Sequence, residues 1–290
     1  MADWIIILES TLRVTTPLLF AALGGLLSER AGVVNIALEG MMLMGAFFGA
    51  SFAHFAGSPA IGLIVGGLAG ALLAALYGLF VIRFRSDQIV AGTAINLLAM
   101  GLTPFLAKVF FDSNGSTPSL EMSERFEYAP VVLVWLTALA VTLWYRFSRS
   151  GLWVQMAGEH PVGLATAGIS VLWTRWSALL MSGFLAGVGG VSLSVFLASS
   201  YTRNMAAGRG FMALAALILG KWKPIPTTLA CLLFGAFEAM QIRLQGVKLW
   251  NDEAVPVQWI QILPYLVTLV VLAGVVGKSR APLRLGRPYP

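Results

Sequence analysis

The sequence predicts an all-α polytopic membrane protein with about nine transmembrane helices, and its composition, hydropathy and uncharged runs lead to this fold class. Of the 290 residues, 58% are hydrophobic and only 11% are charged, and the mean hydropathy is +0.83. Soluble domains typically carry about 25% charged residues, so an ordinary soluble protein is excluded. Each crossing of a bilayer takes roughly 20 helical residues. Such helices would occupy most of the chain, and we expect residues 1–290 to form a single transmembrane domain.

Uncharged runs place the individual helices. The first apolar run covers 14–28, and its helix should begin near Trp4. The uncharged stretch between Glu39 and Arg83 is too long for one crossing and is broken by Gly57-Ser58-Pro59, which predicts a hairpin of two helices. Further runs lie at 88–107, 128–145, 176–202, 210–220, 224–237 and 254–277. The run 210–220 is short enough for a re-entrant half-helix, but a short span buried among its neighbours agrees better with the charge pattern.

Lys and Arg residues are unevenly distributed between alternate loops, which predicts the orientation in the membrane. Cytoplasmic loops carry the excess of positive charge. The larger set consists of Arg30, Arg83, Arg85, Arg146, Arg149, Arg175, Lys221, Lys223, Lys278, Arg280, Arg284 and Arg287, against Arg125, Arg203, Arg209, Arg243 and Lys248 on the other side. We expect an external N-terminus, a cytoplasmic C-terminus and a largest external loop at about 112–127. This bias also accounts for the net charge of +6 and the pI near 9.8, so no nucleic-acid partner is expected.

No motif in the sequence predicts an enzyme. The phosphate-loop pattern G-x-x-x-x-G-K-[ST] is absent, which argues against ATP binding by this chain. The two histidines, His54 and His160, are far apart, and no His, Cys and carboxylate cluster has the spacing of a metal site. Cys231 is the only cysteine, so an intrachain disulfide is excluded.

Small residues recur at every fourth position in one predicted helix. They are Gly62, Gly66, Gly70, Ala74 and Gly78. Small residues on one helix face allow close approach of helix backbones in lipid. This stripe predicts tight helix packing rather than a nucleotide site.

A segment rich in Ala and Gly, at about 149–173, lies between two predicted spans and is too polar to cross the membrane. Pro161 suits the first turn of a helix, and residues 161–167 would form about two turns that end at Gly168. A short helix with small residues on one side could dock in a cleft of another protein. The alternative is an ordinary interfacial loop.

Four motifs, in order along nearly the whole chain, resemble those of ABC importer permeases in the ribose, branched-chain amino acid and nucleoside superfamily. They are Ser28-Glu-Arg-Ala-Gly-Val-Val-Asn35-Ile-Ala-Leu-Glu39-Gly-Met-Met-Leu-Met-Gly45-Ala-Phe, the coupling motif Gly158-x-x-Pro161-x-x-x-Ala165-x-x-Gly168-Ile169, the stretch from Asn204 to Pro224, and the tail with Leu263-Pro-Tyr-Leu-Val-Thr and Gly277-Lys-Ser-Arg-Ala-Pro282. Ribose-type members usually carry Asp-Leu-Ser-x-Gly where this chain has Asn35-Ile-Ala-Leu-Glu39. Branched-chain amino acid members usually carry His-Gly in place of Glu39-Gly40. These departures favour the nucleoside (simple-sugar) branch.

The resemblance implies the permease subunit of an ATP-driven importer of nucleosides or related purines in the bacterial plasma (inner) membrane. It implies no catalysis and no bound cofactor in this chain, because ATP and Mg would be used by a separate cytoplasmic ATPase. An extracytoplasmic binding protein or lipoprotein would deliver substrate, and a second permease subunit would complete a heterodimer. The residues implied in ATPase coupling are Gly158, Glu159, His160, Pro161, Ala165, Ala167, Gly168 and Ile169.

Polar side chains inside the predicted spans are candidates for the translocation pathway or a gate, because such groups are costly in a membrane. Asn35 and Glu39 are four residues apart, which would place them on one helix face, and Arg13 or Arg30 is considered as the partner of the carboxylate. The other candidates are Thr93 with Asn96, and Glu238 with Gln241. The alternative for all of them is hydrogen bonding between helices or a position at the membrane surface.

Two other functions are weighed. The first is a pentose-type simple-sugar permease of the same class. The second is a stand-alone secondary transporter or channel, for which paired ionisable residues or broken helices near the midplane would be expected. The nearly charge-free spans argue against it. The segments 36–45 and 212–220 share an Ala-Leu core between glycines, a weak trace of the internal repeat expected in such permeases.

Overall fold

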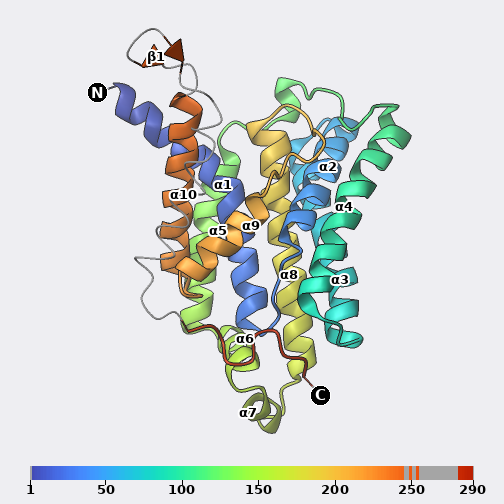
Figure 1. Cartoon of the computed structure of the whole chain (residues 1–290), viewed down its shortest axis with the longest axis vertical. Helices are drawn as coiled ribbons and strands as arrows, with labels where there is room; N and C mark the ends of the chain where they lie inside the picture. The colour runs from blue at the N-terminus through green and yellow to red at the C-terminus, as the bar shows by residue number, and fades with distance from the viewer. Residues whose placement is uncertain (1, 245–247, 250–252, 255–279, 290) are drawn as a thin grey trace.

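The computed structural model describes residues 2–244, 248–249, 253–254 and 280–289, which form an elongated helical bundle (Figure 1). The long helices are α1 (Ala2–Arg30), α2 (Leu38–Ala56), α3 (Pro59–Gly78), α4 (Gln88–Phe111), α5 (Ala129–Phe147), α8 (Val171–Val191) and α10 (Pro224–Leu244). The shorter helices are α6 (Arg149–Glu159), α7 (Pro161–Thr166) and α9 (Arg209–Leu219). Two π-helical turns (Leu79–Arg83 and Ser192–Leu197) extend α3 and α8, a 3-10 turn covers Met122–Glu124, and the two-residue strands β1 (Lys248–Leu249) and β2 (Glu253–Ala254) pair antiparallel.

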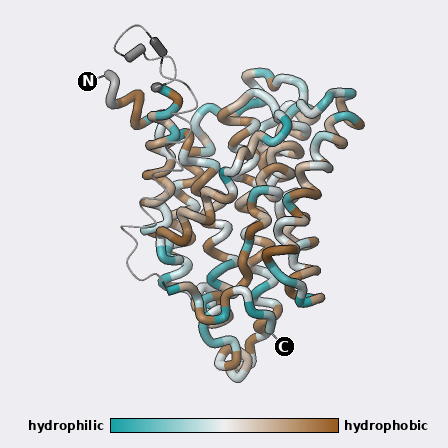
Figure 2. The backbone as a smooth tube through the Cα atoms, viewed as in Figure 1, coloured by the Kyte–Doolittle hydropathy of each residue, from teal (hydrophilic) through white to brown (hydrophobic). Residues whose placement is uncertain are grey.

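Six of the described helical segments are long and apolar enough to cross a membrane. They are Ile5–Arg30, Pro59–Arg83, Gln88–Phe111, Met122–Phe147, Val171–Leu197 and Pro224–Arg243. Hydrophobic residues dominate the middle of the bundle, whereas hydrophilic residues gather towards its two ends (Figure 2). The all-α polytopic membrane architecture is therefore confirmed. The predicted helix at 254–277 lies outside the described residues, and the total of about nine crossings stays a prediction.

The predicted helices are found within the described residues, but several ends differ by four or five residues: α4 continues past Lys108 to Phe111, and the predicted run 176–202 is helical only to Leu197. The hairpin is confirmed, since α2 ends before Gly57, which has a φ of +61°, and Pro59 begins α3. By contrast, α8 begins at Val171 rather than at the predicted residue 176. The predicted run begins after Arg175 because this residue is charged. Its guanidinium nevertheless lies inside the protein, where backbone carbonyls accept its hydrogen bonds.

Two helices, α2 and α9, begin inside the bundle rather than at its ends. After α1, residues 31–37 leave the end that carries α6, α7 and residues 280–289, which we call the α6–α7 end, and run inwards to the start of α2 (Figure 1). Residues 198–208 descend from the opposite end to the start of α9. From this common level α2 and α9 extend in opposite directions, an arrangement typical of inverted repeats with interrupted helices. The sequence similarity of 36–45 and 212–220 falls on these two helices.

The α9 helix is too short to cross a bilayer by itself. Its 11 residues extend about 16 Å at 1.5 Å per residue, about half of a hydrocarbon core. The chain nevertheless continues through α9 to the α6–α7 end. The turn from α9 into α10 lies there, since it lines the same cavity as Arg30 and Gln155. The re-entrant alternative, in which the chain would turn back, is therefore not adopted. The segment before α9 and α9 itself together connect the two ends.

The predicted stripe of small residues forms the contact of α3 with α2 and α8. A Cβ atom added at Gly66 would lie 2.6 Å from the carbonyl oxygen of Gly45 on α2. One added at Gly187 on α8 would lie 2.5 Å from the carbonyl oxygen of Gly66. Gly70 and Gly183 face each other in the same way. Close packing of three helices therefore depends on the absence of side chains at these positions.

We expect Gly187→Val to destabilise the protein strongly, because the added side chain would force α8 away from α3. Overpacking of this kind typically costs about 1–3 kcal/mol. The measurement is the melting temperature of the full-length permease in detergent. Gly101→Val on α4 is the matched control, since a Cβ atom there meets nothing within 4 Å. Equal melting temperatures for the two variants would contradict the packing argument.

Candidate translocation site

The carboxylate of Glu39 joins the starts of the two interrupted helices. Glu39 lies in the first turn of α2 and is only 4% exposed. Its Oε1 accepts a hydrogen bond from the amide of Gly208 at 2.7 Å, and its Oε2 accepts one from the amide of Gly210 at 2.7 Å. Amides in the first turn of a helix lack partners within the helix, and a negative charge near a helix N-terminus is favourable. Glu39 therefore caps α9 from α2.

The partners expected for Glu39 from the sequence are wrong. Arg13 pairs with Glu9 at 3.8 Å, four residues earlier on the same helix. Arg30 pairs with Glu159 at 3.3 Å, at the α6–α7 end. Both arginines belong to α1, which approaches Glu39 at neither of these positions. The actual partners are backbone amides, which no side-chain pattern in the sequence reveals.

A second charged contact extends this junction to α10. Arg209, at the start of α9, forms an ion pair with Glu238 on α10, with 2.5 Å between Nη2 and Oε1. Both side chains are largely buried, with 23% and 13% of their surface exposed. Gln241 lies half-buried one turn further along α10. The candidates Glu39 and Glu238 are thus connected through the first residues of α9.

Asn35 does not share a helix face with Glu39, contrary to the prediction. Helix α2 begins only at Leu38, and Asn35 lies in the irregular segment before it. Its side chain is fully buried, and its Nδ2 donates to the hydroxyl of Ser182 on α8 at 2.8 Å. Asn35 therefore holds the 31–37 segment against α8. The four-residue spacing suggested a helical pair, but the helix is interrupted between the two residues.

Asn96 and Thr93 have different environments although both lie on α4. Asn96 is buried, its Oδ1 accepts from the amide of Gly40 at 2.8 Å, and its Nδ2 donates to the carbonyl of Ile36 at 2.9 Å. It thereby clamps the junction between the 31–37 segment and α2. Thr93 is exposed on the outer face of α4, where its hydroxyl donates to the carbonyl of Ile89. The predicted pair is therefore divided into a buried clamp and a surface residue.

Two residues that the sequence analysis did not select also hold the 31–37 segment. The side-chain oxygen of Gln88 accepts from the amide of Val34 at 2.8 Å. The hydroxyl of Tyr77 donates towards the carbonyl of Val34 at 2.6 Å and that of Gln88 at 3.0 Å. Tyr77 is fully buried although its hydroxyl is polar. A tyrosine within a long apolar run was the available signal, because a buried hydroxyl needs a partner.

The predicted coupling segment contains the expected short helix. Helix α7 covers Pro161–Thr166, and Gly168 has a φ of +80° just beyond it, as the sequence predicted. Helix α6 (Arg149–Glu159) was not predicted. Gly158 and Pro161 are buried, and Ile169 packs against a small apolar cluster under α7. The residues that remain exposed are His160, Ala165, Ala167 and Gly168, whereas Glu159 is half-buried and pairs with Arg30.

The chain end crosses over this segment and ties it to the start of the 31–37 segment. The amide of Arg284 donates to the carbonyl of Gly158 at 2.9 Å, and that of Gly286 donates to the carbonyl of Gly32 at 3.1 Å. The buried guanidinium of Arg175 joins the same elements, because it donates to the carbonyls of Ala31, Ala157 and Arg287 at 3.1, 3.4 and 2.9 Å. Helix α6, residues 31–32 and residues 284–287 thus form one hydrogen-bonded unit.

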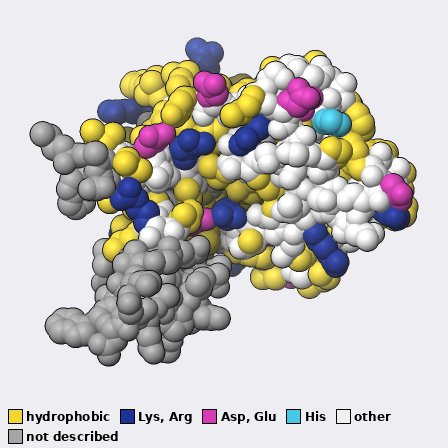
Figure 3. Space-filling view, turned by 90° about the horizontal axis from the view of Figure 1, so that it is seen from above, with side chains coloured by type: hydrophobic (Ala, Val, Ile, Leu, Met, Phe, Trp, Pro, Cys, Tyr) yellow, Lys and Arg dark blue, Asp and Glu magenta, His cyan; other side chains and the backbone are white. Residues whose placement is uncertain are grey.

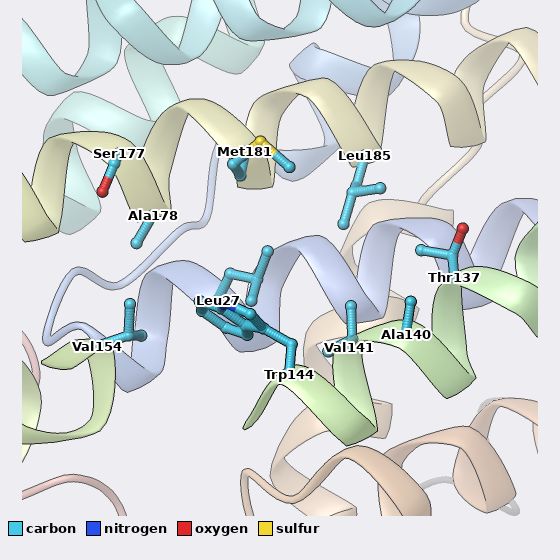
Figure 4. A pocket seen from close by; sticks show the side chains of 10 residues that line it. All are labelled: Leu27, Thr137, Ala140, Val141, Trp144, Val154, Ser177, Ala178, Met181 and Leu185. Atoms are coloured by element: carbon cyan, nitrogen blue, oxygen red, sulfur yellow. The ribbon is translucent and has the colours of Figure 1, made fainter. Parts of the chain in front are cut away.

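A separate cavity of about 490 Å³ lies between α1, α5, α6 and α8 (Figure 4). Its lining is almost entirely apolar, with Leu27, Trp144 and Met181 among the side chains that face it and Thr137 and Ser177 as its hydroxyl groups. None of the predicted pathway residues lines it. This cavity is therefore not the candidate site, which lies where α2 and α9 begin.

Comparison of the sequence with known proteins identifies its family. Residues 7–272 match the family model described as branched-chain amino acid transport system / permease component. The chain belongs to this family of permeases. It is therefore a translocation component of a transport system and, with its apolar helices, a multi-pass protein of the bacterial inner membrane.

The curated relatives match over nearly the whole chain. The nucleoside ABC transporter permease protein NupC of Lactococcus lactis is 35% identical over 98% of this permease and 96% of its own length. The guanosine ABC transporter permease protein NupQ of Bacillus subtilis is 34% identical over the same shares. A more distant relative, the glucose ABC transporter permease protein TsgB13 of Haloferax volcanii, is 24% identical over 88% of this permease and 73% of its own length. No solved structure matches.

We expect Glu39→Gln to lower the melting temperature of the purified full-length permease. The substitution keeps the size of the side chain but leaves one buried amide of α9 without an acceptor, which typically costs about 1–3 kcal/mol. Glu9→Gln is the control, because Glu9 pairs with Arg13 at the surface, where an ion pair is worth about 0–1 kcal/mol. A melting temperature unchanged by Glu39→Gln would show that Glu39 does not cap α9.

Proposed function

We propose that this chain is the permease subunit through which nucleosides or related purines cross the membrane in an ATP-driven importer. The observation that carries the proposal is the identity of 35% and 34% to two permeases named for nucleosides and guanosine, over 98% of the chain. The departures from the ribose-type and branched-chain amino acid motifs at Asn35 and Glu39 agree with this branch. A simple-sugar importer is the second candidate, because a glucose permease is among the relatives.

The interrupted helices support a translocation pathway at the level of Glu39. Irregular backbone is tolerated at membrane depth only where it is buried in protein or lines a water-filled cavity. The segments 31–37 and 198–208 meet this level from opposite ends of the bundle (Figure 1). The charges of Glu39, Arg209 and Glu238 are engaged with one another or with backbone amides. Such a passage suits a neutral, hydroxylated solute, which needs hydrogen bonds rather than a counter-ion.

Interrupted helices also occur in secondary transporters, so their presence here alone does not exclude that class. Two interrupted helices, α2 and α9, are present in the described structure, and Gly208 and Gly210 mark the start of α9 in the sequence. Membership of the permease component family favours an importer that depends on a separate ATPase. In this proposal the ATPase binds ATP and Mg, and the permease itself performs no catalysis.

The α6–α7 end is proposed to face the cytoplasm, with the N-terminus outside and about nine crossings in total. Arg30, Arg146 and Lys223 lie together at this end, and the basic residues Arg284 and Arg287 are bound there through their backbone. At the opposite end, basic and acidic side chains are interspersed among apolar ones (Figure 3). This difference agrees with the excess of positive charge on cytoplasmic surfaces.

The exposed side of α7 is proposed as the docking site for the cytoplasmic ATPase. Val162 is 63% exposed there, and Ala165, Ala167 and Gly168 are exposed beside it. Small side chains allow a partner surface to approach closely. A second permease subunit would complete a heterodimer, and an extracytoplasmic binding protein or lipoprotein would deliver the substrate to the opposite end.

The substrate proposal is tested by uptake into cells that lack nucleoside transport and express the permease with its ATPase, second permease and binding protein. We expect uptake of labelled guanosine that requires ATP and is reduced by unlabelled inosine or adenosine but not by glucose or ribose. Competition by sugars alone would favour the second candidate. Uptake that persists without ATP and stops on collapse of the ion gradient would assign a secondary transporter and contradict the proposal.

Docking through α7 is tested by Gly168→Trp. A bulky side chain at a close contact typically costs about 1–3 kcal/mol, so ATPase binding should weaken about 5- to 150-fold, and uptake should fall while the permease stays in the membrane. Gly57→Trp is the matched control, because both glycines have positive φ, +80° and +61°, and a Cβ atom at either meets nothing within 4 Å. Normal ATPase co-purification and uptake with Gly168→Trp would overturn this docking site.

A further inference from the structure

A basic cavity opens at the α6–α7 end between the ends of α1 and α5, helix α6 and the turn into α10. Its volume is about 350 Å³. The charged groups that line it are Arg30, Arg146 and Lys223, and the aromatic side chains are Tyr145 and Trp222. Among the residues that the structure describes, no acidic side chain lines it. The cavity is distinct from the junction at Glu39 and from the exposed side of α7.

Two of the three cations are available to a ligand. Arg30 already pairs with Glu159 at 3.3 Å and donates to the hydroxyl of Tyr145 at 2.6 Å. Arg146 and Lys223 are exposed and form no ion pair with a carboxylate in the part of the chain that the structure describes. Among the described residues these two positive charges have no carboxylate partner, and the cavity therefore fits an anion.

The turn that carries Lys223 is held rigidly. Lys221 and Trp222 both have a φ of +53°, a left-handed conformation that is unfavourable for residues with side chains. The indole of Trp222 is directed inwards, where its Nε1 donates to Glu29 at 2.6 Å. This buried bond holds the turn against α1, and Lys223, the next residue, lines the cavity together with Arg146.

The surfaces beside the cavity show which anion it takes. Leu139, Leu143 and Phe147 are exposed along α5, and Ile225 and Leu229 are exposed along α10. Both helices belong to the segments that can cross a membrane. Ile225 lines the cavity, Leu143, Leu139 and Leu229 lie further along the two helices towards the middle of the bundle, and Phe147 lies at the end of α5. Basic and aromatic residues at the end of such helices lie at the level of the lipid headgroups.

We propose that this cavity binds the phosphate of an anionic phospholipid between Arg146 and Lys223, with the acyl chains along α5 and α10. The charge complementarity selects the phosphate, and the exposed apolar side chains of α5 and α10 select a lipid over a free anion. The bound headgroup would lie next to the Arg30–Glu159 pair, through which α6 is connected to α1. Anionic lipid is thereby expected to stabilise the α6–α7 end.

The test measures the melting temperature of the full-length permease in detergent with added phosphatidylglycerol, phosphatidylcholine of the same acyl chains, or inorganic phosphate. We expect stabilisation by phosphatidylglycerol well above that by phosphatidylcholine, and none by inorganic phosphate. The double substitution Arg146→Gln with Lys223→Gln should abolish this difference. The control is Arg149→Gln with Arg85→Gln, which removes two exposed cations that do not line the cavity.

Each other outcome would overturn the proposal. An equal loss of stabilisation in both double variants would show non-specific attraction to the basic surface. Stabilisation of the wild type by inorganic phosphate to the same extent would assign a free-anion site. Loss of ATPase co-purification with the cavity variant, at unchanged lipid stabilisation, would identify a protein interface. If the cavity variant does not fold, native mass spectrometry of the wild type decides, and retention of phosphatidylcholine equal to that of phosphatidylglycerol contradicts the site.

Discussion

The rest of the structure depends on the hydrogen-bond acceptors that the carboxylate of Glu39 provides. A helix that starts inside a membrane protein has first-turn amides without partners in the helix, and lipid cannot accept hydrogen bonds from them. Such groups must find partners within the protein. Glu39 accepts from Gly208 and Gly210, so the start of α2 supplies the acceptors that the start of α9 requires. The two interrupted helices are therefore stable together, and the irregular segments 31–37 and 198–208 can reach the middle of the bundle.

This junction requires that the surrounding helices pack closely enough to exclude lipid. The contacts of Gly66 with Gly45 and of Gly187 with Gly66 bring α3, α2 and α8 to backbone contact. Within that framework, Asn35 binds α8 through Ser182, and Asn96 binds both sides of the start of α2 from α4. The small residues set the distances between helices, and the buried side-chain amides of Asn35 and Asn96 then hold the irregular segment 31–37 and the start of α2 in place. In lipid, packing and hydrogen bonds of this kind replace the hydrophobic effect between helices.

Hydropathy and turn residues predicted the helices that run from end to end, and Pro161 with Gly168 predicted α7, because these signals are local. The interruption before α2 was not predictable in this way. Asn35 and Glu39 have helical spacing, and the residues between them carry no helix-breaking signal. The partners of Glu39 and Arg175 are backbone amides and carbonyls contributed by distant segments, and any residue presents such groups. The predicted ionic partners of Glu39 were wrong because charged side chains can be identified in a sequence, whereas the backbone amides that lie near a given carboxylate cannot.

The connection between the α6–α7 end and Glu39 follows from the number of buried bonds that a local movement would break. Arg175 binds carbonyls of residues 31, 157 and 287 at once. A displacement of α6 alone would leave an N–H group of the buried Arg175 guanidinium without an acceptor, and each unsatisfied buried group costs about 1–3 kcal/mol. These bonds are all kept only when α6, residues 31–32 and residues 284–287 move together with the start of α8, which carries Arg175. Because residues 31–37 lead directly to α2, and Glu39 binds α9, such a collective movement would reach the level at which both helices begin. In the proposed transport cycle, an ATPase that displaces α7 would therefore act on the pathway through backbone already bonded into one unit.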